Sequence, residues 1–160
     1  MADDCCAVTS VQTQAVSQAC PVCGTKGKSV DTQTVKAMLD VSLRTLRGDV
    51  YRFCRNESCE IVYFGDGSDV YTEDDLRERV YQKHPDTADV FVCYCFRHTP
   101  ASIRQELLLT GTSSVVEQVN AGIAAGQCAC EIRNPQGSCC LGNVTATVKR
   151  VQKSLTPITA

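Results

Sequence analysis

Cys20-Pro21-Val22-Cys23-Gly24 is the stretch that decides how the first half of this chain folds. Two residues separate the cysteines, and the glycine after them lets the backbone turn so that both thiolates face one ion. A second pair, Cys54 and Cys59, follows about 30 residues later. Alternating apolar residues predict strands over 48–53 and 60–64, which places this second pair on a hairpin.

A knuckle pair and a hairpin pair together predict a closed tetrahedral zinc site made by Cys20, Cys23, Cys54 and Cys59. Such a site contributes folding free energy directly, because the unfolded chain has no preformed site. Four sulfurs also suit iron in a rubredoxin-like site, but the longer second pair favours zinc. Asp66-Gly67 marks a further turn, Val70-Tyr71 is a candidate third strand, and 73–82 is helical or extended.

The second half carries a different group of cysteines, with a different spacing. They are Cys93, Cys95, Cys128, Cys130, Cys139 and Cys140. A Cys-x-Cys at the end of a strand can place two thiolates on one iron of a [2Fe–2S] cluster, and two more from the 128–140 loop can hold the other. Four thiolates on a diferric cluster leave a net charge of −2, which calls for positive surroundings. Residues 89–160 have 4 acidic and 6 basic residues, whereas residues 1–88 have 14 and 10.

Helical patterns fill the rest of the second half. Thr99-Pro100 predicts a helix start, and that helix ends at Gly111. A second helix begins at Ser113 or Ser114 and ends at Gly126, and a third covers about 141–153. With Lys83–Asp89 as the boundary, we expect an α+β chain: a zinc-stapled β-rich unit at 19–88, then a helical [2Fe–2S] unit at 89–153. Residues 1–18 and 154–160 are expected to be tails.

Composition excludes several classes of protein. Neither half has the basic stripe of a nucleic-acid-binding protein. No secretory signal and no run of 18 apolar residues is present, so we expect a cytoplasmic protein without membrane insertion. Adjacent and closely spaced cysteines suit metal ligation better than a disulfide scaffold. There is no serine triad, phosphate loop or paired-carboxylate set, so we predict a one-electron redox protein rather than a turnover enzyme.

The strings VCYCFRHTPASI and CACEIRNPQGSCCLGNV resemble the [2Fe–2S] half of the N-terminal domain of CopZ-type copper chaperones, itself similar to bacterioferritin-associated-ferredoxin-like domains. The strings CPVCG, VYRFC and CEIVYF resemble the zinc half of that domain. The resemblance covers roughly Ala19 to Val151. It implies zinc at the first four cysteines, and a cluster at Cys93, Cys95, Cys130 and one of Cys139 or Cys140, with a lean to Cys140.

Chaperones of this type also carry a heavy-metal-associated domain with a Met-x-Cys-x-x-Cys loop. The two methionines here, Met1 and Met38, lie near no such motif. Cys128 and the Cys5-Cys6 pair have no assigned role and are either idle thiols or soft ligands for Cu⁺. Arg97 is positioned to donate to a cluster sulfur. His98 is either part of a helix entry or tunes the cluster, and His84 is expected to be solvated.

The function expected from these features is redox-assisted copper handling. The cluster would reduce Cu(II) to Cu(I), which then passes to a copper chaperone or a copper-transporting ATPase. A ferredoxin-like partner in electron transfer or iron mobilisation, without copper binding, is the alternative. A zinc-stapled interaction module that binds zinc at both cysteine groups is a third.

Overall fold

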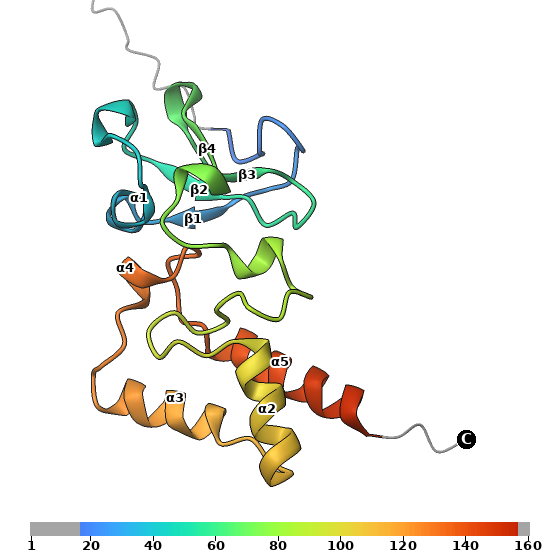
Figure 1. Cartoon of the computed structure of the whole chain (residues 1–160). Helices are drawn as coiled ribbons and strands as arrows, with labels where there is room; N and C mark the ends of the chain where they lie inside the picture. The colour runs from blue at the N-terminus through green and yellow to red at the C-terminus, as the bar shows by residue number, and fades with distance from the viewer. Residues whose placement is uncertain (1–16, 157–160) are drawn as a thin grey trace, which may run out of the picture.

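The computed structural model describes residues 17–156, so Cys5 and Cys6 lie outside the described residues. A small antiparallel sheet comes first and a group of helices second (Figure 1). The strands of the sheet are β1 (Lys28–Val30), β2 (Tyr51–Phe53), β3 (Ile61–Gly65) and β4 (Val70–Thr72), with helix α1 (Thr32–Met38) between the first two. The later helices are α2 (Pro100–Thr110), α3 (Val115–Ala124), α4 (Cys130–Arg133) and α5 (Leu141–Leu155).

The sheet has the order β1-β2-β3-β4, with every neighbouring pair antiparallel. The register of β2 and β3 places Phe53 opposite Tyr63, and their rings meet edge to face at 6.2 Å. This hairpin was predicted, and the connection between its strands carries Cys54 and Cys59. The first strand and α1 were not predicted. Their only local signals are the Asp31 cap, which accepts from Gln33 N at 2.8 Å, and a short apolar stripe.

Two large hydrophobic cores divide the described chain, beside a small third cluster around Cys20, Cys54 and Cys59. One lies between the sheet and α1 and includes the fully buried Tyr51, Tyr63 and Val80. The other lies among α2, α3 and α5 and begins with Tyr81. The change from one core to the other therefore falls between Val80 and Tyr81, slightly before the 83–89 boundary expected from the sequence.

The helical half follows its sequence signals closely. Thr99 caps α2 by accepting from Ser102 N at 3.1 Å, and Gly111 ends it with φ +78°. The α5 helix, predicted over about 141–153, buries one face that includes Val144, Val148 and Val151. The expected cysteine-bearing loop at 128–140 also contains one short helical turn, α4, that the sequence did not predict. No helix within residues 17–156 combines the length and hydropathy needed to cross a membrane.

Candidate metal centres

The first cysteine group is built by a knuckle and a hairpin, as the spacing predicted. Gly24 has φ +72°, and its N–H donates to Cys20 O at 2.9 Å, which closes the knuckle. At the hairpin, Cys54 N donates to Val62 O at 2.8 Å, and Asn56 accepts from Cys59 N and Ser58 N. These turns aim four thiols at one point, between the loop that enters the sheet and the loop that joins β2 to β3.

The sulfur atoms of Cys20, Cys23, Cys54 and Cys59 all lie within 4.8 Å of one another. Cys20 Sγ is 3.9 Å from Cys59 Sγ, and Cys23 Sγ is 3.6 Å from Cys54 Sγ. A tetrahedral zinc with Zn–S bonds near 2.3 Å needs sulfurs about 3.8 Å apart. The four-cysteine group therefore has the right chemistry and spacing for Zn²⁺. Ile61 and Phe64 pack against it and limit solvent access.

The four thiols differ in how readily they ionise. Burial raises the pKa of the Cys54 thiol to about 12 and also raises the pKa of Cys59. Hydrogen bonds from Thr25, first from its side chain and then from its backbone, lower the pKa of the Cys23 thiol to about 6. Because zinc binds thiolates, an incoming ion must displace the protons of Cys54 and Cys59.

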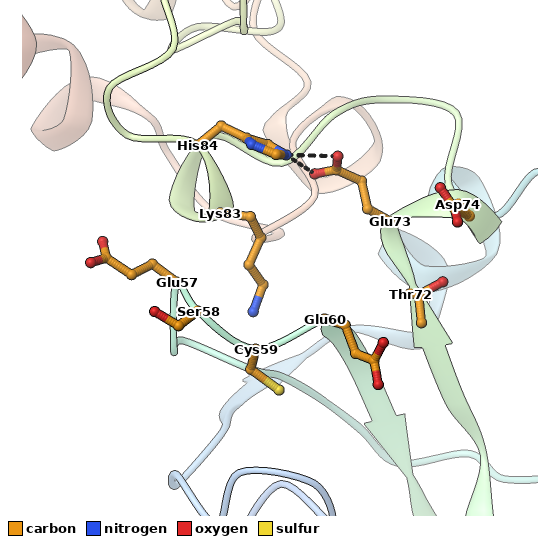
Figure 2. Close-up of a pocket in the computed structure, with 9 residues that line it drawn as sticks. All are labelled: Glu57, Ser58, Cys59, Glu60, Thr72, Glu73, Asp74, Lys83 and His84. Carbon is orange, nitrogen blue, oxygen red and sulfur yellow. Dashed lines mark hydrogen bonds and ion pairs between the residues drawn. The ribbon is translucent and has the colours of Figure 1, made fainter.

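Lys83 reaches the hairpin from the segment that joins the two halves (Figure 2). Its Nζ donates to Asn56 O at 2.6 Å, and its charge opposes the effect of burial on the Cys54 pKa. It shares a pocket of about 390 Å³ with Cys59, Glu73 and His84. His84 was expected to be solvated, but its Nε2 contacts both carboxylate oxygens of Glu73, at 2.7 and 2.9 Å. Neither contact has a local signal in the sequence, because Lys83 lies 27 residues from Asn56 and His84 lies 11 residues from Glu73.

The second cysteine group is brought together by a tight turn and by the ends of two helices. Residues 93–98 form the turn, in which His98 N donates to Cys93 O at 3.2 Å. Cys130 begins α4, and Cys140 lies directly before the first residue of α5. Cys93, Cys130 and Cys140 belong to the core of the helical half, whereas Cys139 is exposed. Of the two adjacent cysteines, Cys140 is therefore the one that joins the group.

The contacts within this group run across the loops. Cys95 Sγ is 3.7 Å from Cys130 Sγ and also accepts from Ala129 N at 3.2 Å. A hydrogen bond from the Cys140 thiol lowers the pKa of Cys93 to about 6 and raises that of Cys140. The pKa of the Cys130 thiol is raised to about 12, mainly by burial and secondly by the charge of the nearby Cys95. The sequence had suggested Cys93 with Cys95 as one pair, but each member of the turn instead contacts a member of the 130–140 loop.

Three residues that the sequence placed near this group lie as follows. Arg97 adopts φ +62°, with its guanidinium 4.0 Å from the centre of the Phe91 ring and 3.3 Å from Glu78 Oε1. Arg97 was expected to point toward the sulfurs, but it is directed toward Glu78 and Phe91 instead. Burial lowers the pKa of the His98 imidazole. Cys128 is half-buried at the margin of the helical core.

All ten cysteines within residues 17–156 are free thiols. The zf_CopZ family, described as a zinc binding domain, matches residues 17–77, which contain the whole first group. The chain is 33% identical over 151 residues to a protein named copper chaperone CopZ from Archaeoglobus fulgidus, covering 88% of this chain and 71% of that protein.

This chain belongs to the CopZ family. The X-ray structure of the Archaeoglobus fulgidus CopZ N-terminal domain resembles it with a TM-score of 0.66 at 32% identity. That likeness covers 80% of this chain and 95% of the other. The chain therefore contains a CopZ-type zinc-binding domain with a four-cysteine group, followed by a helical portion.

Proposed function

We propose that this CopZ-family chain is a redox accessory protein in copper handling, with zinc at Cys20, Cys23, Cys54 and Cys59. We further propose a [2Fe–2S] cluster at Cys93, Cys95, Cys130 and Cys140. The cross-paired, largely buried thiols of the second group are the observation that carries this proposal. Two pairs of sulfurs, one for each iron, are what such a cluster requires.

The spread of the second group also favours two irons over a single ion. Among the described residues, only the first group brings three or more metal-ligating atoms within 4.8 Å of one another. The second is wider, although Cys95 Sγ and Cys130 Sγ are only 3.7 Å apart. A cluster with two metal atoms accommodates that larger spread, whereas a lone zinc does not.

The surroundings suit an anionic group. A diferric cluster with four thiolates has a net charge of −2, and α5, with 15 residues, begins directly after Cys140. The positive end of the helix dipole therefore faces the group. Burial of Cys93 and Cys140 excludes water from these sulfurs. The bound cluster would supply one electron, accepted earlier from an external donor, at a potential of roughly −400 mV, low enough to reduce Cu(II) to Cu(I).

Cu(I) is a soft ion and needs thiolates to hold it. Cys139 is exposed and adjacent to a proposed cluster ligand, and Cys128 is half-buried beside the same core. These spare thiols are the candidate copper ligands, together with Cys5 and Cys6 outside the described residues. A copper-transporting ATPase or a copper chaperone is the proposed recipient, and the free thiols fit the reducing cytoplasm. The relative from Archaeoglobus fulgidus is itself named a copper chaperone.

The test begins with protein purified without oxygen. One zinc, two irons and two sulfides per chain are expected, with an EPR signal after reduction by dithionite. Reduced protein mixed with Cu(II) should reoxidise its cluster and retain Cu(I). Oxidised protein is the control, because free thiols reduce Cu(II) unaided. Equal Cu(I) yields from both forms would favour the alternative, a ferredoxin-like electron carrier or a partner in iron mobilisation.

A further inference from the structure

The loop that connects Cys130 to Cys140 rests on the zinc-binding half. Its first turn, α4, packs against α1 (Figure 1). Lys28 Nζ, at the start of β1, donates to Ser138 Oγ at 2.6 Å. Gly137 has φ +66°, and a Cβ atom there would lie 3.0 Å from side-chain atoms of both Thr34 and Val30. The loop thus approaches the β1–α1 segment so closely that a side chain at this position would crowd Thr34 and Val30, in addition to the strain of its positive φ.

One buried hydroxyl anchors the loop to the central hairpin. Tyr63 of β3 is fully buried, and its hydroxyl donates to the carbonyl of Pro135, which is buried as well. Burial raises the pKa of the Tyr63 phenol, so it remains a donor at any physiological pH. The strand that carries this hydroxyl begins two residues after Cys59. A proposed zinc ligand therefore lies two residues before the strand that carries the anchor of the second loop.

The loop is also stiff within itself. Asn134 is buried, and its Nδ2 donates to Ser138 O at 2.8 Å while its Oδ1 accepts from Gln136 N at 3.2 Å. These bonds fold 134–138 into one compact turn. A displacement of Pro135 therefore moves Ser138, and with it Cys140, which lies directly before α5.

We propose that Tyr63 is a positioning residue for the second cysteine group. Its hydroxyl fixes the 130–140 loop on the hairpin of the four-cysteine site and so sets where Cys130 and Cys140 lie relative to Cys93 and Cys95. The expected effect on metal retention rests on the cluster in the proposed function. The placement of Cys130 and Cys140 by Tyr63 does not depend on which metal they bind.

The test compares Tyr63→Phe with Tyr71→Phe. Tyr71 is a matched control, because it lies in the same core and its hydroxyl meets Thr45 Oγ1, at 3.1 Å, within the same half. Zinc content should equal that of wild type in both variants. Under anaerobic chelation, Tyr63→Phe should lose its visible absorbance at least about fivefold faster than wild type, as expected for a buried carbonyl left unpaired. Tyr71→Phe should stay within about twofold.

A second measurement does not need the cluster. In zinc-loaded, iron-free protein, iodoacetamide labelling followed by mass spectrometry should modify Cys130 and Cys140 faster in Tyr63→Phe than in Tyr71→Phe. The exposed Cys139 is the internal reference and should label equally in both. If Cys130, Cys140 and Cys139 each label at the same rate in the two variants, the positioning role of Tyr63 is overturned. This holds even if one variant also loses its metal. A different outcome separates the two proposals. If wild-type protein purifies without iron but Cys130 and Cys140 still label faster in Tyr63→Phe, the proposed cluster function is rejected. The role of Tyr63 as the anchor of the 130–140 loop then still holds.

Discussion

Zinc affinity should depend on pH in two regimes, with a break near pH 6. Between about pH 7 and 9, Cys54 and Cys59 are protonated in the metal-free protein, because burial raises the pKa of both thiols. Cys23, with its pKa lowered to about 6, is already ionised there. Zinc binding then releases at least two protons, so affinity should fall at least about 100-fold for each unit by which pH falls.

Below about pH 6, Cys23 becomes protonated as well, and each further unit should weaken binding at least about 1,000-fold. Competition with a chromophoric chelator at half-unit intervals from pH 5 to 8.5 measures this slope. Thr25→Val is the matched variant, because it removes the side-chain hydrogen bond that is the largest cause of the low Cys23 pKa. Its break should move to higher pH, whereas its slope above pH 7.5 should match that of wild type.

The refuting result is a steep, unbroken dependence that Thr25→Val leaves unchanged. That behaviour is expected if the metal-free zinc half unfolds, since all four thiols would then have the ordinary cysteine pKa of about 8.5. The reasoning from folded-state hydrogen bonds would no longer apply.

Three further outcomes are expected. Cys140→Ser should abolish the visible spectrum and iron content of the anaerobically purified protein while Cys139→Ser retains both, and the reverse result would assign the cluster to the exposed thiol. Lys83→Met should speed zinc release to a chelator about fivefold at low salt and by less at high salt, because the hydrogen bond and the charge near Cys54 are lost together. Gly137→Ala and Gly126→Ala both place a side chain at positive φ, at a cost of about 1 kcal/mol. Only at Gly137 would the added methyl group meet neighbouring atoms. Gly137→Ala should therefore lose more stability in urea unfolding than Gly126→Ala. Equal losses would mean that the 130–140 loop can shift to make room for the methyl group.

Local signals in the sequence accounted for much of the fold. The knuckle glycine, the apolar alternation around Cys54 and Cys59, and the Thr99-Pro100 helix start each act within a few residues. Each therefore predicted its element with bounds close to those observed. The sequence does not decide between Cys139 and Cys140, because which of them is buried depends on how the start of α5 is oriented against the helical core.

Contacts between distant segments could not be predicted. Nothing near Tyr63 in the sequence indicates that its hydroxyl meets Pro135, and nothing near Lys83 indicates Asn56. The crosswise contact of Cys95 with Cys130 belongs to the same class. The Cys-x-Cys spacing suggested local pairing, whereas the 93–98 turn directs its two thiols toward different ends of the 130–140 loop. Such arrangements follow from tertiary packing, which a short motif does not encode.

The crosswise contacts give both cysteine groups the topology of nested rings. Cys23–Cys54 closes a ring inside the one closed by Cys20–Cys59, and Cys95–Cys130 lies inside Cys93–Cys140. Closing a ring of 31 residues costs about 4 kcal/mol of chain entropy, and an enclosing ring adds little more once the inner one has formed. The two nests are consecutive along the chain and do not interlock. A ribosome therefore synthesises all four cysteines of the zinc nest before it reaches Cys93, so the platform for the 130–140 loop is made ahead of that loop.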